Sequence, residues 1–266
     1  MSRTETITSP ANPVFKQIRR AIERGGLTDD GLCVADTFHL LEEALRSGLE
    51  TPLVLAAESA RPGVRTRVER LKGTRVLAVP DSLLRKLSDT ETSQGVLALV
   101  RPPTWTLDRI FHGCPLVLVL DEVQDPGNAG AIIRAAEAFG ATGAIFVKGS
   151  VNPFNTKTLR ASAGSLFRLP HVTGMEASAV RALLQERKAE IYAGVPAGQP
   201  GALNASQANL RRGCALVIGN EARGISAELR PAARNIFIPT AGVESLNAAM
   251  AAGILLYEAR RQRLNP

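Results

Sequence analysis

The side chains best suited to chemistry lie in three loops, each of which directly follows a run of apolar residues. The first loop, residues 121–130, reads Asp-Glu-Val-Gln-Asp-Pro-Gly-Asn-Ala-Gly and is followed by Arg134. The second, residues 219–224, reads Gly-Asn-Glu-Ala-Arg-Gly, and the third, residues 238–247, reads Ile-Pro-Thr-Ala-Gly-Val-Glu-Ser-Leu-Asn. Amides, carboxylates and a guanidinium can bind and orient a polar substrate, and glycine allows close approach of the main chain to a ligand.

Each loop also has a purely structural interpretation. Asn128 stands where a helix N-cap would lie, and Arg134 could form a surface ion pair with Glu137, three residues later. A strand followed by Gly219 and Asn220 is a common turn. The third loop could be a helix start with a polar cap.

Several other classes of site have little support in the sequence. The three cysteines (33, 114 and 214) and the three histidines (39, 112 and 171) are scattered. We therefore expect no disulfide framework, no metal site and no Ser-His-Asp mechanism. A nicotinamide-dependent oxidoreductase would carry a G-x-G-x-x-G turn, which the sequence at 125–130 does not supply.

Alternating strands and helices must position the three loops. The first hundred residues predict helices at 13–24, 37–47, 63–71 and 81–87 and strands at 32–34, 52–55, 76–79 and 95–100. The second half predicts strands at 115–120, 144–147, 191–194, 215–218 and 236–238 and helices at 130–139, 176–189 and 246–263. This order predicts a small α/β domain followed by a parallel-sheet α/β domain that binds ligands beyond the C-terminal ends of its strands. The break at 101–104 sets the boundaries at 1–104, a linker at 105–112, and 113–266.

Charge and hydropathy are compatible with a polyanionic partner or with a merely soluble basic protein, and they do not favour a membrane protein. The formal net charge is +7, and residues 113–266 carry most of the surplus. One face of the first helix gathers four basic residues, which could follow a phosphate backbone or simply be solvated: Lys16, Arg19, Arg20 and Arg24. The N-terminus has no apolar targeting segment, and the longest apolar stretch, 248–257, is too short to span a bilayer. We therefore expect a cytoplasmic protein.

Together the three loops resemble the motifs of the SpoU (TrmH) family of RNA ribose 2′-O-methyltransferases, within the SPOUT superfamily. The matching residues are Asp125-Pro126-x-Asn128 with Arg134, then Gly219-Asn220-Glu221-x-x-Gly224, and finally Ile238-Pro239 with Ser245-Leu246-Asn247. Residues 9–100 more weakly resemble the L30e-like substrate-binding domain that precedes the catalytic domain in several members. They depart from it at 34–37, Val-Ala-Asp-Thr, where members often read Val-Glu-Gly.

The resemblance implies a fold, a cofactor and roles for the matching residues. It implies a deep trefoil knot near the C-terminus, a homodimer formed through the C-terminal domain, and S-adenosylmethionine bound in the knot. The implied cofactor-binding residues are Gly219, Asn220, Ile238, Pro239 and Leu246. The implied catalytic residues are Asn128, Arg134, Glu221, Ser245 and Asn247. Because a guanidinium stays protonated at ordinary pH, Arg134 suits a phosphate clamp better than a base.

The identity of the RNA is less constrained. Aromatic residues make up only 4% of the chain, so recognition by charge and folded shape is expected rather than base stacking. Two-domain members mostly modify large-subunit ribosomal RNA, so the resemblance favours 23S rRNA. The alternatives are a transfer RNA substrate and a non-catalytic RNA-binding protein that retains the cofactor site.

Overall fold

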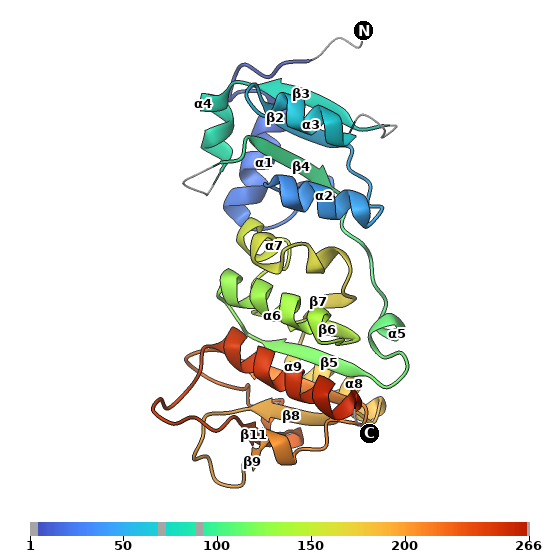
Figure 1. The fold of residues 1–266 in the computed structure, drawn as a ribbon, viewed down its shortest axis with the longest axis vertical. Coiled ribbons are helices and arrows are strands. Elements are labelled where there is room, and N and C mark those ends of the chain that lie inside the picture. The colour runs from blue at the N-terminus through green and yellow to red at the C-terminus, as the bar shows by residue number, and fades with distance from the viewer. Residues whose placement is uncertain (1–4, 69–72, 89–92, 265–266) are drawn as a thin grey trace. The chain divides into compact units, whose positions relative to one another are not determined.

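The computed structural model describes residues 5–68, 73–88 and 93–264 and contains two compact units (Figure 1). The first unit comprises Met1–Pro103 and Asn152–Phe167, and the second comprises Thr104–Val151 and Arg168–Pro266. The predicted boundaries, with domains at 1–104 and 113–266 and a linker at 105–112, stay predictions.

The first unit is built around a four-stranded mixed sheet with the strand order β1-β4-β2-β3. Strand β4 is antiparallel to both β1 and β2, whereas β2 and β3 are parallel. The strands are β1 Cys33–Ala35, β2 Leu53–Ala57, β3 Arg75–Val79 and β4 Val96–Val100. The helices are α1 Pro13–Arg24, α2 Phe38–Arg46, α3 Arg61–Val68, α4 Asp81–Leu84 and α7 Thr156–Ser162, with 3-10 turns η1 Arg85–Leu87 and η2 Ser165–Phe167. The predicted small α/β domain is thus confirmed as a fold class.

Local signals explain the limits of helix α1. The side chain of Asn12 accepts a hydrogen bond from the amide of Val14 (2.9 Å), and Pro13 occupies the first helical position. Gly25 ends the helix in the left-handed conformation, at φ 62°. The predicted helix 13–24 is therefore confirmed at both ends.

Residues 152–167 pack within the first unit although they follow strand β6, Gly143–Val147, of the second. Arg160 of α7 forms an ion pair with Asp36, whose side chain is only 4% exposed. The tetrapeptide that departs from the family pattern, residues 34–37, therefore contributes a buried partner for this segment. Sequence periodicity gave no expectation for α7, because its sequence, Thr-Lys-Thr-Leu-Arg-Ala-Ser, has little apolar patterning.

The second unit is built on a seven-stranded sheet in which every neighbouring pair is parallel, with the order β7-β6-β5-β10-β8-β11-β9. The strands are β5 Leu116–Asp121, β6 Gly143–Val147, β7 His171–Met175, β8 Glu190–Gly194, β9 Leu203–Asn204, β10 Cys214–Gly219 and β11 Arg234–Phe237. The helices are α5 Leu107–Ile110, α6 Pro126–Ala138, α8 Ala177–Glu186 and α9 Ala248–Leu264, with 3-10 turns η3 Ala205–Gln207 and η4 Arg230–Ala232. The predicted parallel sheet is confirmed.

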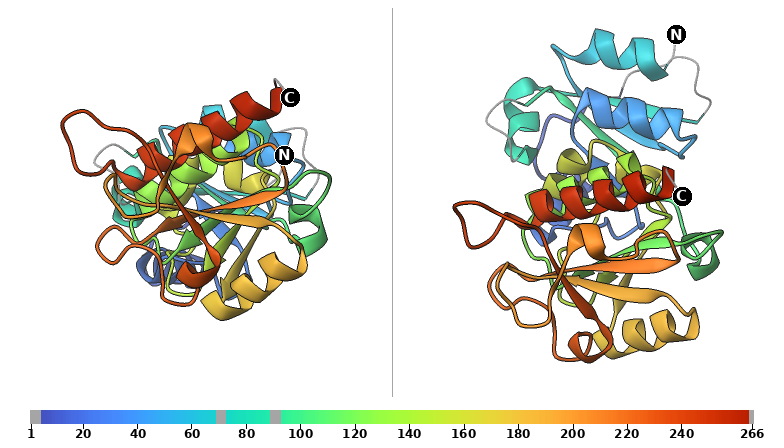
Figure 2. Two further views of the ribbon diagram at one scale, coloured as in Figure 1. Left: turned by 90° about the horizontal axis from the view of Figure 1, so that it is seen from below. Right: turned by 60° about the horizontal axis from the view of Figure 1, so that its bottom comes forward.

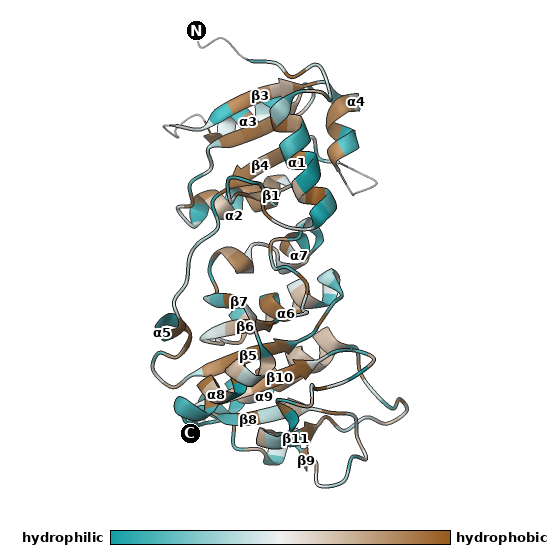
Figure 3. Ribbon diagram, turned by 180° about the vertical axis from the view of Figure 1, so that it is seen from behind, coloured by the Kyte–Doolittle hydropathy of each residue, from teal (hydrophilic) through white to brown (hydrophobic). Residues whose placement is uncertain are grey.

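Helices cover both faces of this sheet, so its central strands are apolar along most of their length. Helix α9 lies beside α6 on one side and α8 lies on the other (Figure 2). All six residues of β5 are buried, and β5 and β10 are hydrophobic along most of their length (Figure 3). Burial on both faces explains why β5 reads as a continuous branched apolar run instead of an alternating one.

Three helices begin two or more residues away from their predicted starts. Helix α6 begins at Pro126 rather than at 130, because the Asp125 side chain caps it by accepting the amide of Asn128 (2.6 Å). Helix α9 begins at Ala248 rather than at 246, after Asn247, whose side chain accepts the amide of Ala249 (2.9 Å). The predicted helix 63–71 begins at 61, and its residues 69–71 lie outside the described part of the chain.

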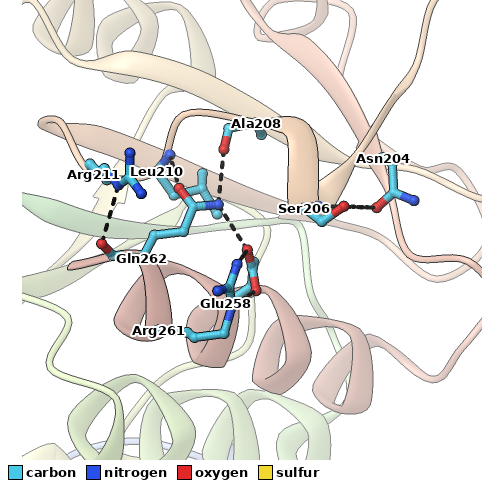
Figure 4. Close-up of polar contacts among 8 residues, drawn as sticks. All are labelled: Asn204, Ser206, Ala208, Leu210, Arg211, Glu258, Arg261 and Gln262. Atoms are coloured by element: carbon cyan, nitrogen blue, oxygen red, sulfur yellow. Dashed lines mark hydrogen bonds and ion pairs between the residues drawn. The ribbon is translucent and has the colours of Figure 1, made fainter. Parts of the chain in front are cut away.

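A buried glutamine holds the C-terminal end of α9 in place (Figure 4). Gln262 accepts the amide of Leu210 (3.0 Å) and donates to the carbonyl of Ala208 (3.0 Å) and to the carboxylate of Glu258 (2.8 Å). The next residue, Arg263, donates to the carbonyl of Leu210 (2.8 Å). These bonds fix the direction of α9, whose first residue, Ala248, directly follows the third loop.

Candidate active site

A cavity of about 560 Å³ lies at the C-terminal ends of strands β8, β10 and β11, next to the start of α9. This is the edge of the sheet at which the sequence predicted ligand binding. Its apolar wall is formed by Ile218, Ile236, Ile238, Leu246 and Leu255. Its polar lining comes largely from the second and third motif loops.

The second loop, residues 219–224, is a tight turn whose shape requires glycine. A Cβ placed on Gly219 would lie 2.5 Å from the main chain of Gly224, a distance that real contacts do not show. The amide of Asn220 donates to the carbonyl of Gly224 (3.0 Å), and the amide of Gly224 donates back to the carbonyl of Asn220 (2.8 Å). Gly224 adopts a positive φ of 70°, which favours glycine.

The side chain of Asn220 shapes this loop from within. Its Oδ1 accepts the amides of Ala222 and Arg223, both at 3.0 Å, and its Nδ2 donates to the carbonyl of Glu122 (2.9 Å). Asn220 lines the cavity and is itself buried. With its side-chain atoms engaged in these bonds, its part in ligand binding would be to hold the loop.

Asn128 joins all three motif loops. Its Nδ2 donates to Oε1 of Glu221 (3.0 Å), 93 positions away, and its Oδ1 accepts Nδ2 of Asn247 (2.9 Å), 119 positions away. Because Asp125 caps α6, the Asn128 side chain is not the N-cap and is available for this network. Glu221 and Asn247 both line the cavity, and Asn128 holds them from its edge.

Arg134 does not lie among the described residues that line the cavity. It is exposed on α6, six residues after Asn128, which corresponds to about 9 Å along a helix. The simple ion pair with Glu137 is not formed, since Glu137 binds Arg168 instead (2.9 Å). Within the described part of the chain, the guanidinium of Arg134 has no hydrogen-bond or ionic partner.

The remaining predicted site residues belong to the third loop, and all but one of them line the cavity. Ile238, Ser245 and Leu246 line the cavity, whereas Pro239 does not appear among the described residues that do so. Neither the amide nor the carbonyl of Leu246 takes part in a hydrogen bond within the described chain. A ligand in the cavity can therefore use these main-chain groups.

Sequence reasoning missed a buried carboxyl group beneath the second loop. Asp121, the last residue of β5, is 1% exposed, and its Oδ2 accepts the amide of Ser226 (2.7 Å). Burial raises the pKa of this carboxyl above its ordinary value, and the hydrogen bond from Ser226 offsets part of that effect. The sequence did carry a signal for this buried carboxyl, namely an acidic residue at the end of a continuous apolar strand.

The four predicted RNA-contacting residues lie on α1 in the first unit. Three of them engage acidic residues: Arg19 pairs with Glu23 (2.7 Å), and Arg20 and Arg24 both approach Asp29 (3.7 and 2.8 Å). The ammonium group of Lys16 has no ionic partner within the described residues. The helix face is therefore less strongly positive than its sequence indicates.

The described residues offer neither a metal site nor a membrane-spanning helix. Within the described residues, no group of three or more His, Cys, Asp or Glu side chains is arranged to hold a metal ion. In the same part of the chain, no helix combines the length and apolar character needed to cross a bilayer.

Comparisons with known proteins match both units. The model of the SpoU rRNA methylase family matches residues 115–257, and that of the MRM3-like substrate-binding domain matches residues 12–98. An uncharacterized tRNA/rRNA methyltransferase of Synechocystis is 32% identical, over 97% of this chain and 94% of the relative. The 23S rRNA (guanosine(2553)-2′-O)-methyltransferase RlmP of Bacillus subtilis is 30% identical, over 96% of this chain and 98% of that protein.

A solved structure agrees with these matches over nearly the whole chain. It is the SpoU methyltransferase AviRb of Streptomyces viridochromogenes in complex with AdoMet, 28% identical, with a TM-score of 0.81. The similarity covers 96% of this chain and 100% of that one. The chain belongs to the SpoU rRNA methylase family.

Proposed function

We propose that the chain transfers a methyl group from S-adenosylmethionine to a ribose 2′-hydroxyl of 23S ribosomal RNA. The observation that carries this proposal is the Asn128 network, in which residues of three distant motif loops meet at the edge of one cavity. The 23S rRNA 2′-O-methyltransferase activity in the name of the Bacillus subtilis relative supports the substrate. A transfer RNA substrate is the alternative.

The cavity fits S-adenosylmethionine in size and chemistry. Its volume of about 560 Å³ falls in the range typical of small-molecule sites. The apolar side chains of Ile238 and Leu246 suit an adenine ring, and the unbonded main chain of Leu246 can bind the edge of that ring. When bound, the cofactor supplies a sulfonium methyl group that needs no further electrophilic activation. AviRb, whose AdoMet complex is similar across the chain, supports this assignment.

The residues of this chain have to orient the sugar and assist removal of its proton. A ribose 2′-hydroxyl is a poor nucleophile until it loses that proton, so alignment and proton transfer are the two requirements. Asn128, Glu221 and Asn247 form a fixed polar cluster for positioning the ribose, and Ser245 adds a hydroxyl at the cavity wall. Arg134 clamps an RNA phosphate and stabilises the developing alkoxide, while the phosphate or a water accepts the proton.

Arg134 can serve this role if a second copy of the chain completes the site. Within one copy it is exposed on α6 and outside the cavity lining. Helix α9, which packs beside α6, exposes three large apolar side chains at helical spacing: Met250 (56%), Ile254 (38%) and Tyr257 (55%). An exposed apolar stripe of this kind is typical of a protein interface. We therefore propose a homodimer through the C-terminal unit, with Arg134 of each copy serving the other.

The family resemblance adds three further elements to the proposal. The first unit binds the RNA substrate, in keeping with its match to the MRM3-like substrate-binding domain. The cofactor loops form a deep trefoil knot. The third is a cytoplasmic location, which the bacterial 23S rRNA methyltransferases among the relatives support.

Transfer of labelled methyl from S-adenosylmethionine to purified RNA tests the proposal. The purified protein should label 23S rRNA, and a 2′-deoxynucleotide at the modified position should abolish the labelling. Labelling of transfer RNA in place of 23S rRNA would establish the alternative substrate. Binding of both the cofactor and the RNA without any transfer would establish a non-catalytic RNA-binding protein.

A further inference from the structure

The charged residues that line the cavity are not equally available to a ligand. Glu221 accepts a hydrogen bond from Asn128, and Arg223 forms an ion pair with Glu122 at 2.7 Å. Arg230 also lines the cavity, and within the described chain it has no acidic partner. Arg230 therefore supplies this cavity with a positive charge that forms no ion pair within the described chain.

The main chain around Arg230 is firmly held. Leu229 is fully buried, and the amide of Arg230 donates to the carbonyl of Ser226 (3.1 Å). The guanidinium folds back towards the preceding residues, and its Nη2 donates to the carbonyl of Ile225 (3.0 Å). It passes over Gly224, since a Cβ on that residue would lie 3.9 Å from Nη2. One N–H is used in this way, and a guanidinium has five.

S-adenosylmethionine carries one anionic group, the α-carboxylate of its amino acid part. The sulfonium and the ammonium are both positive, and the adenosine is neutral. A planar guanidinium matches a carboxylate through two parallel hydrogen bonds, which makes it the best side chain for this group. The acids that line the cavity, Glu221 and Glu244, would repel the carboxylate.

We infer that Arg230 binds the α-carboxylate of S-adenosylmethionine and thereby distinguishes the intact cofactor from analogues that lack this group. This inference rests on the proposed function, because it takes the cofactor as given. It assigns Arg230 a role in cofactor binding that is separate from the RNA and from the Asn128 network. The same charge could instead bind an RNA phosphate, and the experiment below separates the two.

Calorimetric titration with two ligands tests the inference. The ligands are S-adenosylmethionine and decarboxylated S-adenosylmethionine, which differ only in the carboxylate. The wild-type protein should prefer the intact cofactor by roughly tenfold or more, as expected for a charge-assisted hydrogen bond. Arg230→Gln should remove most of this preference by weakening only the intact ligand. Arg230→Lys, which keeps the charge without the planar fork, should retain part of it.

Two control variants and an RNA titration complete the design. Arg181→Gln removes a nearby arginine outside the cavity lining, whose Nη1 donates to the carbonyl of Glu228 (3.0 Å), and the ligand preference should not change. A lost preference in Arg223→Gln, with Arg230→Gln unaffected, would overturn the inference. So would an Arg230→Gln protein that keeps the preference but loses affinity for RNA. A wild-type protein that binds neither ligand would instead overturn the proposed function itself.

Discussion

Arg134 is the residue whose role depends most on charge. Its guanidinium is exposed and has no partner within the described chain, and Glu137 on the same helix is already bound by Arg168. An unneutralised arginine on the helix that begins at the Asn128 network is well placed to meet an RNA phosphate. This observation removes the simplest structural explanation for Arg134 and leaves the functional one.

Replacing Arg134 should separate chemistry from cofactor binding. We expect Arg134→Ala to lower methyl transfer by about a hundredfold or more, a loss typical for a group that stabilises developing charge. Arg134→Lys should also be poor, because an ammonium lacks the planar fork. The affinity for S-adenosylmethionine should hardly change, since Arg134 lies outside the cavity lining. Single-turnover rates and calorimetry would check this, and near-normal rates in Arg134→Ala would contradict the assignment.

The buried carboxyl of Asp121 should make the difference in stability between the wild type and an Asp121→Asn variant depend on pH. Its pKa in the folded protein is raised above the ordinary 3.8 by burial, so the carboxyl opposes folding once the unfolded side chain ionises. Below pH 3.8 both states are protonated and this opposition is absent. Asp121→Asn keeps an oxygen for the amide of Ser226 and removes the charge.

We therefore expect Asp121→Asn to be more stable than the wild type at neutral pH, by a margin that shrinks towards pH 4. Thermal unfolding of both proteins across this range would measure the margin. A variant that is less stable than the wild type, with a deficit that grows as the pH rises, would show that the ionised carboxylate stabilises the fold.

Helix α9 connects the cavity to the far end of the sheet. It begins beside the third motif loop, and the hydrogen bonds of Gln262 hold its last turn (Figure 4). Because Gln262 is buried, its loss removes one hydrogen bond each from the amide of Leu210 and the carbonyl of Ala208, which are then left with the 3.1 Å bond between them. The position of the loop at the start of α9 thus depends on contacts about four turns away.

Gln262→Leu should therefore destabilise the protein by about 2 kcal/mol, since it removes three side-chain hydrogen bonds that each contribute roughly 0.5–1.5 kcal/mol. Arg261→Gln is the matched control. Arg261 directly precedes Gln262, its side chain is half exposed, and the substitution breaks only its ion pair with Glu258. We expect almost no change in that variant. Urea unfolding would compare the two, and equal effects would contradict the role given to Gln262.

The sequence patterns predicted elements well wherever apolar periodicity was strong. Helix 13–24 and the run that became β5 were placed nearly to the residue. Strand β7 was missed because it lies at the sheet edge and is largely exposed, so it shows no apolar run. The start of α6 was wrong because Asp125 and Asn128 are both good capping residues, and the choice between them depends on the contacts of Asn128 with Glu221 and Asn247.

At the scale of the molecule, the chain contributes residues to each unit from separate stretches of sequence. Residues 152–167 belong to the first unit through contacts such as Arg160 with Asp36, although the strands on either side of them belong to the second. No local pattern could predict this, since it depends on which distant surface the segment meets. The trefoil knot and the dimer are also properties of the whole assembly, and they stay predictions.

The RNA-binding role of the first unit predicts a change in salt dependence. Lys16 and Arg20 lie one turn apart on α1, and among the described residues their ionic contacts amount to the 3.7 Å approach of Arg20 to Asp29. The double variant Lys16→Gln, Arg20→Gln should bind RNA more weakly. The slope of log affinity against log salt should fall by about 2, roughly 0.9 per lost phosphate contact.

The affinity for S-adenosylmethionine should be unchanged in this double variant, because the cavity is formed by the second unit. Arg75→Gln is the control, since Arg75 lies in β3 and is already paired with Glu5 (2.6 Å). Filter binding at several salt concentrations would measure both slopes. An unchanged slope in the double variant would show that this face of α1 is only solvated.

The most direct measurement is a map of ribose methylation in ribosomal RNA from cells with and without this protein. The account predicts that one 2′-O-methyl group in 23S rRNA disappears when the protein is absent. It should return with the wild-type chain and not with Arg134→Ala. If every ribose methyl group in 23S rRNA persists without the protein, the proposed reaction on this RNA is contradicted.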